Sequence, residues 1–115
     1  MYRFSYAEVL EDTPQTSRER ELQALQHSID LLQAAQEKGA ASREAIEAIY
    51  FLRKLWTFFI EDLGKPGNDL PKQLRADLIS IGLWLIRESD RVRQRESDNF
   101  KGLIEVSQLI ADGMR

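Results

Sequence analysis

The longest apolar run in the sequence is LISIGLWLI, at residues 78–86. At about 100° of rotation per residue, its apolar side chains fall on two neighbouring stripes of a helix and leave almost no polar face. Helices that are apolar on nearly all sides are normally buried. We therefore predict a central buried helix over residues 71–95, with Trp84 in the core. Gly82 costs this helix roughly 1 kcal/mol relative to alanine, which is tolerable where a neighbouring ring or backbone must come close.

The rest of the chain reads as helices that pack around this run. Apolar residues recur at helical spacing, Ser42 has the form of a helix N-cap, and Gly39 has the form of a helix stop. Pro71 suits the first turn of a helix, where its missing N–H is not needed. These signals predict an all-α, compact four-helix bundle-like domain, with main helices over residues 16–38, 42–63, 71–95 and 98–114 and a short extra N-terminal helix over residues 6–10.

The predicted helix over residues 42–63 contains the heaviest aromatic block in the chain. Its broad apolar face comprises Ile46, Ile49, Leu52, Trp56, Phe59, Ile60 and Leu63. A second apolar face comprises Phe51, Leu55 and Phe58. Because each apolar face must be covered, two faces predict two packing partners for this helix.

Length and composition exclude several classes of protein. A chain of 115 residues that is 43% apolar and 30% charged can fold as one domain without metal or disulfide support. Its formal net charge of −3 argues against a dedicated nucleic-acid binder, and the lack of cysteine excludes disulfides, zinc ribbons and thiol catalysis. The amino terminus lacks the apolar core of a signal peptide, and residues 78–86 are too short to cross a bilayer. We expect a cytoplasmic protein without membrane insertion.

No pattern of side chains points to catalysis or to a metal. His27 is the only histidine, and Ala24 stands where the Glu-x-x-His motif of helix-bundle metal sites needs a glutamate. Phosphate-cradle and nucleophile-elbow motifs are also missing from the sequence. We expect a protein that is not an enzyme and that needs no metal or cofactor.

Aromatic side chains provide one candidate surface for a partner. Tyr2, Phe4 and Tyr6 lie in a segment too short to form a core of its own, so they either pack onto the bundle or form an exposed apolar site. The candidate partner-binding residues are Tyr2, Phe4, Tyr6, Phe51, Leu55 and Phe58. The candidate rim charges, which would affect the rate of encounter with a partner, are Arg18, Arg20, Glu61 and Asp62.

A basic stripe provides a second candidate surface. Arg87, Arg91 and Arg95 recur every four residues and therefore share one helix face. Cations near the end of a helix complement its dipole, so the stripe is either a solvated face or a track for the phosphates of RNA. The acidic residues among them favour the solvated face.

A series of short segments along the whole chain resembles one family. They are FSYAE at 4–8, RERE at 18–21, LWT at 55–57, IEDL at 60–63, LP at 70–71, LRA at 74–76, LISIGLW at 78–84, FKGLIE at 100–105 and DG at 112–113. In this order they resemble FlaF, a family of bacterial flagellar biosynthesis regulators. The resemblance implies that residues 1–115 form a single FlaF-like helical domain.

The resemblance also implies a function in flagellum biogenesis. FlaF-like proteins are thought to bind flagellin as its secretion chaperone or assembly factor, in concert with FlbT, a regulator of flagellin translation. Flagellin is therefore the expected protein partner, FlbT is a second candidate partner, and nucleic acid is not expected. The alternative is a post-transcriptional regulator that binds flagellin mRNA directly through the arginine stripe.

Overall fold

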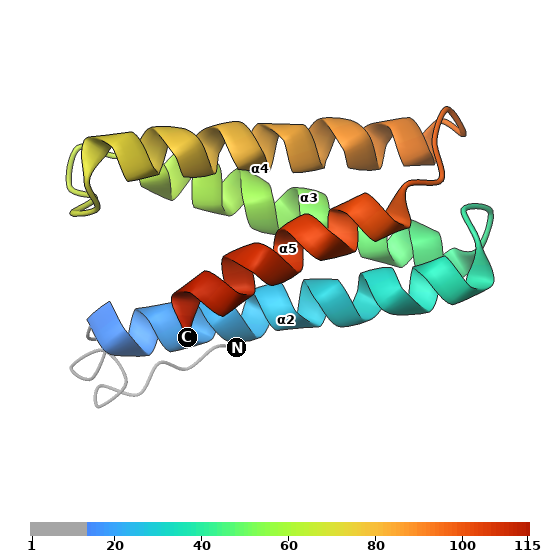
Figure 1. Cartoon of the computed structure of the whole chain (residues 1–115), viewed down its shortest axis with the longest axis horizontal. Helices are drawn as coiled ribbons and strands as arrows, with labels where there is room; N and C mark the ends of the chain where they lie inside the picture. The colour runs from blue at the N-terminus through green and yellow to red at the C-terminus, as the bar shows by residue number, and fades with distance from the viewer. Residues whose placement is uncertain (1–13) are drawn as a thin grey trace, which may run out of the picture.

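The structure is a computed structural model and describes residues 14–115 as four helices. In the labels of Figure 1 these are α2 (Pro14–Lys38), α3 (Arg43–Leu63), α4 (Lys72–Arg93) and α5 (Phe100–Met114). The prediction of an all-α bundle is confirmed for this part of the chain. The short helix predicted over residues 6–10 lies outside the described residues.

The helices form a bundle with one weak seam. α3 packs against both α2 and α4, and α2 also packs against α5, whereas α4 and α5 have little contact with each other. Figure 1 shows the reason: α5 runs obliquely, from the C-terminal end of α4 toward the N-terminal end of α2. The α4–α5 pair is therefore closed at one end and open at the other.

The turn between α2 and α3 uses the predicted cap residues. Gly39 has φ +96°, a left-handed conformation that ends α2 and that glycine adopts without strain. The Ser42 hydroxyl accepts a hydrogen bond from the backbone N–H of Ala45 at 3.1 Å and donates one to the carbonyl of Gly39 at 2.7 Å. Ser42 therefore fixes the start of α3, as the sequence predicts.

The end of α4 differs from the prediction by one half-turn. The helix stops at Arg93 because Arg95 has φ +63°, a left-handed conformation that interrupts it. The N–H of Glu96 donates to the carbonyl of Arg91 at 2.9 Å, and that of Arg95 donates to Val92 at 3.1 Å. This is the Schellman pattern of a helix end, which usually has glycine at the left-handed position.

The core is built from one face of each helix, and most of it matches the predicted periodicity. α2 contributes Leu25, Ile29 and Leu32, which are fully buried. α5 contributes Phe100 and Leu103, also buried. The buried apolar residues of the other two helices are Ala45, Ala48, Ile49, Leu52, Trp56, Leu63, Leu85 and Val92.

The prediction that residues 71–95 form the buried centre is wrong. α3 is the central helix, because it packs on both α2 and α4. The two predicted faces are only partly covered, since Ile46 of the first is 68% exposed and Phe58 of the second is 57% exposed. α4 lies at the edge, where Leu74 is 43% exposed and Leu83 is 40% exposed. Trp84 is 36% exposed and does not belong to the core. An apolar run indicates a helix with apolar surface to bury, but it does not show how many neighbouring helices cover that surface. In this fold, α5 leaves one side of α4 uncovered.

Trp56 is the buried tryptophan instead, and Gly82 makes room for it. Trp56 is only 2% exposed. A Cβ atom added at Gly82 would lie 2.5 Å from Cε3 of Trp56 and 3.1 Å from Cδ1 of Ile60, closer than packed atoms come. The expectation that a ring approaches the backbone at Gly82 is thus confirmed, and it explains how α3 and α4 pack so closely.

Candidate partner-binding pocket

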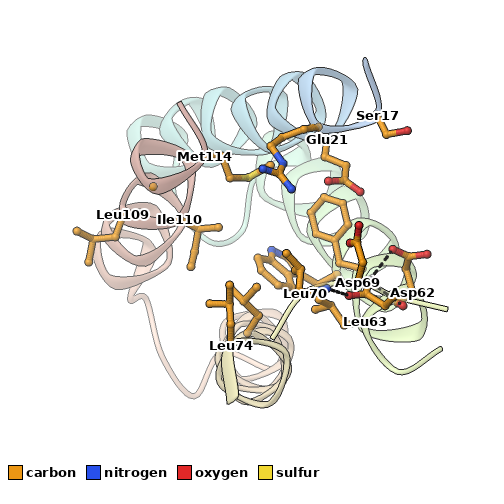
Figure 2. A pocket seen from close by; sticks show the side chains of 16 residues that line it. Ser17, Glu21, Asp62, Leu63, Asp69, Leu70, Leu74, Leu109, Ile110 and Met114 are labelled. Atoms are coloured by element: carbon orange, nitrogen blue, oxygen red, sulfur yellow. Dashed lines mark hydrogen bonds between the residues drawn. The ribbon is translucent and has the colours of Figure 1, made fainter. Parts of the chain in front are cut away.

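A hollow lined by described residues lies at the open end of the bundle. It has a volume of about 480 Å³ and takes residues from all four helices and from the α3–α4 loop. Figure 2 looks into it, with α5 at the left, α4 at the bottom, α2 at the top and α3 at the right. The lining residues are Ser17, Arg18, Glu21, Trp56, Phe59, Asp62, Leu63, Asn68, Asp69, Leu70, Leu74, Leu78, Leu109, Ile110, Gly113 and Met114.

The floor of the pocket is aromatic. The rings of Trp56 and Phe59, both on α3, meet edge to face with centroids 5.2 Å apart. The indole nitrogen of Trp56 is buried and has no hydrogen-bond partner among the described residues. An unpaired buried donor is uncommon in a folded protein and costs free energy. The floor therefore combines an apolar surface with one unused N–H group.

The walls of the pocket are aliphatic. In Figure 2, Leu74 from α4 and Ile110 from α5 point toward the centre of the hollow, whereas Leu109 points outward from α5, away from the centre. Leu109 is 70% exposed, the highest value for a large apolar side chain in the described part of the chain. An apolar hollow with exposed apolar edges is typical of a surface that binds a partner.

The pocket exists because α5 is too short and too oblique to cover α4. α5 has 15 residues and α4 has 22, so α5 is about 10 Å shorter at 1.5 Å of rise per residue. α5 begins beside the C-terminal end of α4, and the two helices diverge toward the N-terminal end of α4 (Figure 1). The apolar stripes that face each other there have no third helix between them.

Charged groups lie on the α2 and α3 side of the rim. Figure 2 shows the Glu21 carboxylate pointing from α2 toward the side where Asp62 and Asp69 lie. Burial raises the pKa of Glu21, the negative charge of Asp62 raises it further, and Arg18 opposes both. Asp62 accepts a hydrogen bond from the side-chain amide of Asn68 at 3.4 Å. The rim is therefore acidic, with one arginine among three carboxylates.

The structure brings together only part of the predicted partner surface. Tyr2, Phe4 and Tyr6 lie outside the described residues. Phe51 meets the ring of His27 edge to face at 4.8 Å, Leu55 packs partly buried against the core, and Phe58 is 57% exposed. None of these three lines the pocket. Of the four predicted rim charges, Arg18 and Asp62 line it, whereas Arg20 and Glu61 do not.

Comparison with known proteins then places the chain in a family. The family model for the flagellar protein FlaF matches residues 2–114, nearly the whole chain. The chain belongs to the FlaF family. No curated protein and no solved structure matches it. The resemblance seen in the sequence is confirmed.

The arginine stripe of this FlaF-family chain has a mixed charge. Arg91 donates to a carboxylate oxygen of Glu88 at 2.8 Å, while Arg87 and Arg95 are exposed. On the next face of α4, Asp90 accepts hydrogen bonds from Arg53 at 2.8 Å and from Arg93 at 2.7 Å. The hydrogen bond from Arg93 is the main reason that the pKa of Asp90 is lowered. These pairs reduce the positive field that a phosphate backbone would meet.

Glu88 closes the opposite end of the α4–α5 pair. Its side chain is 8% exposed and accepts hydrogen bonds from Ser97 at 3.1 Å and from Asn99 at 3.0 Å, besides that from Arg91. Burial would raise the pKa of Glu88, but the bonds from Asn99, Arg91 and Ser97 outweigh it and lower the pKa. Asn99 also caps α5 by accepting from the N–H of Gly102 at 2.9 Å. Glu88 thus ties the end of α4 to the start of α5.

Within residues 14–115, no three His, Cys, Asp or Glu side chains are placed to hold a metal ion. No helix in this part of the chain is long and apolar enough to span a membrane.

Proposed function

We propose that this FlaF-family chain binds flagellin in the cytoplasm and acts as its secretion chaperone and assembly factor, in concert with FlbT. The observation that carries the proposal is the apolar pocket at the open end of the α4–α5 pair. A chaperone for an unassembled subunit needs a surface that covers an apolar stripe of its client. The proposed role is therefore binding and not catalysis.

The chemistry of the pocket suits the apolar face of an amphipathic helix. A helix with its side chains is about 10–12 Å across, and its apolar face can lie in a groove between two other helices. Leu74 and Leu109 present apolar surface at the two edges, and the rings of Trp56 and Phe59 form the floor. A flagellin helix in this position would complete the bundle and cover its own apolar face.

The aromatic residues ahead of α2 are proposed to take part in the same interaction. Ser17 and Arg18, in the first turns of α2, line the pocket, so the segment that contains Phe4 and Tyr6 is attached close to its rim. We expect Phe4→Ala with Tyr6→Ala to weaken flagellin binding by ~1–2 kcal/mol without unfolding the bundle. Loss of binding accompanied by a large fall in melting temperature would instead place these rings in the core.

The direct test of the pocket is a calorimetric titration with flagellin. The double variant Leu74→Ser/Leu109→Ser removes apolar surface from both edges, and we expect its affinity to fall about tenfold or more. The matched control is Ile46→Ser/Tyr50→Ser, because Ile46 is 68% exposed and Tyr50 is 63% exposed near the other end of α3. Equal affinity in the two double variants would contradict the pocket as the binding site.

The alternative function, direct binding of flagellin mRNA through Arg87, Arg91 and Arg95, has less support. Arg91 already pairs with Glu88, and the chain carries a formal charge of −3. If this alternative is correct, RNA affinity must fall steeply with salt, and changing all three arginines to glutamine must flatten the salt dependence by about two to three units. We expect neither result.

A further inference from the structure

The acidic rim distinguishes the pocket from an ordinary apolar groove. Three carboxylates, those of Glu21, Asp62 and Asp69, lie around it with Arg18 as the one cation. Glu21 and Asp62 come from different helices and carry like charges. Burial is the main reason that the pKa of Glu21 is raised, the charge of Asp62 raises it further, and Arg18 opposes both only in part. Like charges held together by the fold are relieved by a cation that binds between them.

The floor provides a second and independent sign of a ligand. Trp56 is 98% buried and lines the pocket, yet its indole N–H has no acceptor among the described residues. The Cε3 edge of the ring is pressed against Gly82 of α4, and the N–H lies on the opposite side of the indole. The donor therefore faces away from α4. Because the nitrogen is buried, a ligand acceptor reaches it by displacing a neighbouring side chain, and the new bond then recovers the free energy of an unmade one.

We propose that the pocket selects an amphipathic helix of a partner protein that carries a lysine or arginine beside its apolar face, with the cation between Glu21 and Asp62 and the apolar face over Trp56. A side-chain oxygen or amide carbonyl on the same helix accepts the hydrogen bond from the indole. The proposal rests on the proposed function, because it specifies which flagellin segment the same pocket takes.

Charge complementarity distinguishes a partner helix from two other possible occupants of the pocket, the chain's own amino-terminal segment and a second copy of the chain. The chain's own amino-terminal segment carries Glu8, Glu11 and Asp12 against the single cation Arg3, so it is acidic like the rim. A second copy of the chain would bring the same acidic rim to the interface. A basic helix matches the rim, which favours a partner with cations at the edge of its apolar stripe.

The experiment uses two synthetic peptides, so that it does not depend on flagellin. Both are amphipathic helices of about 18 residues with the same leucine face and one central glutamine, and they differ only in lysine or glutamate at the positions that border the leucines. Affinity for the full chain is measured by fluorescence anisotropy at low ionic strength, where charge preference is largest. The background variant is Trp84→Phe, so that the one remaining indole signal in a ¹H–¹⁵N spectrum belongs to Trp56.

The expected result has three parts. The lysine peptide binds about tenfold more tightly than the glutamate peptide, and its binding shifts the Trp56 indole signal downfield. Glu21→Gln/Asp62→Asn reduces the preference to less than about threefold. The control Glu37→Gln/Glu47→Gln, which removes two exposed carboxylates away from the pocket, keeps the preference.

Several results would overturn the proposal. Equal affinity for the two peptides, or a preference that survives Glu21→Gln/Asp62→Asn, would show that the rim does not select charge. Binding of neither peptide would also count against it. If binding then appeared in Phe4→Ser/Tyr6→Ser, the chain's own amino-terminal segment would be the occupant; self-association abolished by Leu74→Ser/Leu109→Ser would identify a second copy. Failure of flagellin to bind, with a clear lysine preference, would remove flagellin as the client and leave the pocket's chemistry standing.

Discussion

The two ends of the α4–α5 pair differ in the kind of contact between the helices. At the C-terminal end of α4, Glu88 holds three donors and joins the helix to the cap of α5, so the seam is polar, satisfied and closed. At the N-terminal end the helices separate, and apolar side chains such as Leu74 and Leu109 face solvent. Satisfied hydrogen bonds fix a geometry, whereas uncovered apolar surface is available to a partner. We therefore expect the closed end to fix the geometry of the α4–α5 pair and the open end to bind the partner.

The largest expected effect concerns the two tryptophans. Trp56→Ala should lower the free energy of unfolding by ~3–5 kcal/mol, because it empties the space between α3 and α4. Trp84→Ala should cost much less, since this ring is 36% exposed at the edge of the bundle. Chemical denaturation of both variants measures the difference. Equal losses would restore α4 as a buried helix and remove the distinction between covered and uncovered sides.

The next effect concerns the closed end. Glu88→Gln should lower the free energy of unfolding by about 1–2 kcal/mol at neutral pH, because it weakens the hydrogen bonds from Arg91, Ser97 and Asn99. The pKa of Glu88 is lowered in the folded state, so its contribution is present above the unfolded pKa near 4.5 and is lost as pH falls through the folded value. Melting curves of parent and variant should therefore converge in acid. A gap that stayed constant down to low pH would mean that the charge of Glu88 is not involved.

A smaller gain is expected at the end of α4. Arg95→Gly should raise the free energy of unfolding by ~0.5–1 kcal/mol, because glycine adopts φ +63° without strain. Arg87→Gly is the control: it removes the same side chain inside the helix and should cost about 1 kcal/mol. Destabilisation by both would show that the Arg95 side chain matters more than its backbone conformation.

The smallest effect is expected at the open end. Because the pKa of Glu21 is raised in the folded state, stability falls as pH rises from the unfolded value of 4.5 through the folded one. Glu21→Gln should therefore melt slightly above the parent at neutral pH and show no advantage in acid. A lower melting temperature at neutral pH would indicate that Glu21 already has a compensating cation.

Local signals in the sequence predicted local structure well. Gly39 and Ser42 act through their own backbone and nearest neighbours, so their roles at the helix ends could be predicted from the sequence. Gly82 was also interpretable, because a glycine inside an apolar helix implies close approach. Arg95 was not, since arginine gives no signal for a left-handed residue. The prediction that α4 lies at the centre of the fold was wrong for another reason, because an apolar stripe does not show how many helices cover it.

The pocket could not be predicted from the sequence, for a physical reason. Its residues come from the four helices and the α3–α4 loop, and only the oblique path of α5 brings Ile110 and Met114 opposite Leu74. The usable signal was the length of the last helix, 15 residues against 21 or more for each of the other three. Arg18 and Asp62, which were predicted from the sequence at the rim of another surface, line this pocket because both lie at helix ends that meet at the same end of the bundle.

Hydrogen exchange of the full chain with and without flagellin tests the contrast between the two ends most directly. Backbone amides at the open end, in residues 70–78 and 106–114, should become protected when flagellin is added, because a bound helix covers them. Amides at the closed end, in residues 93–102, should exchange at the same rate in both samples. Protection confined to residues 93–102, or no change at the open end at saturating flagellin, would contradict the account.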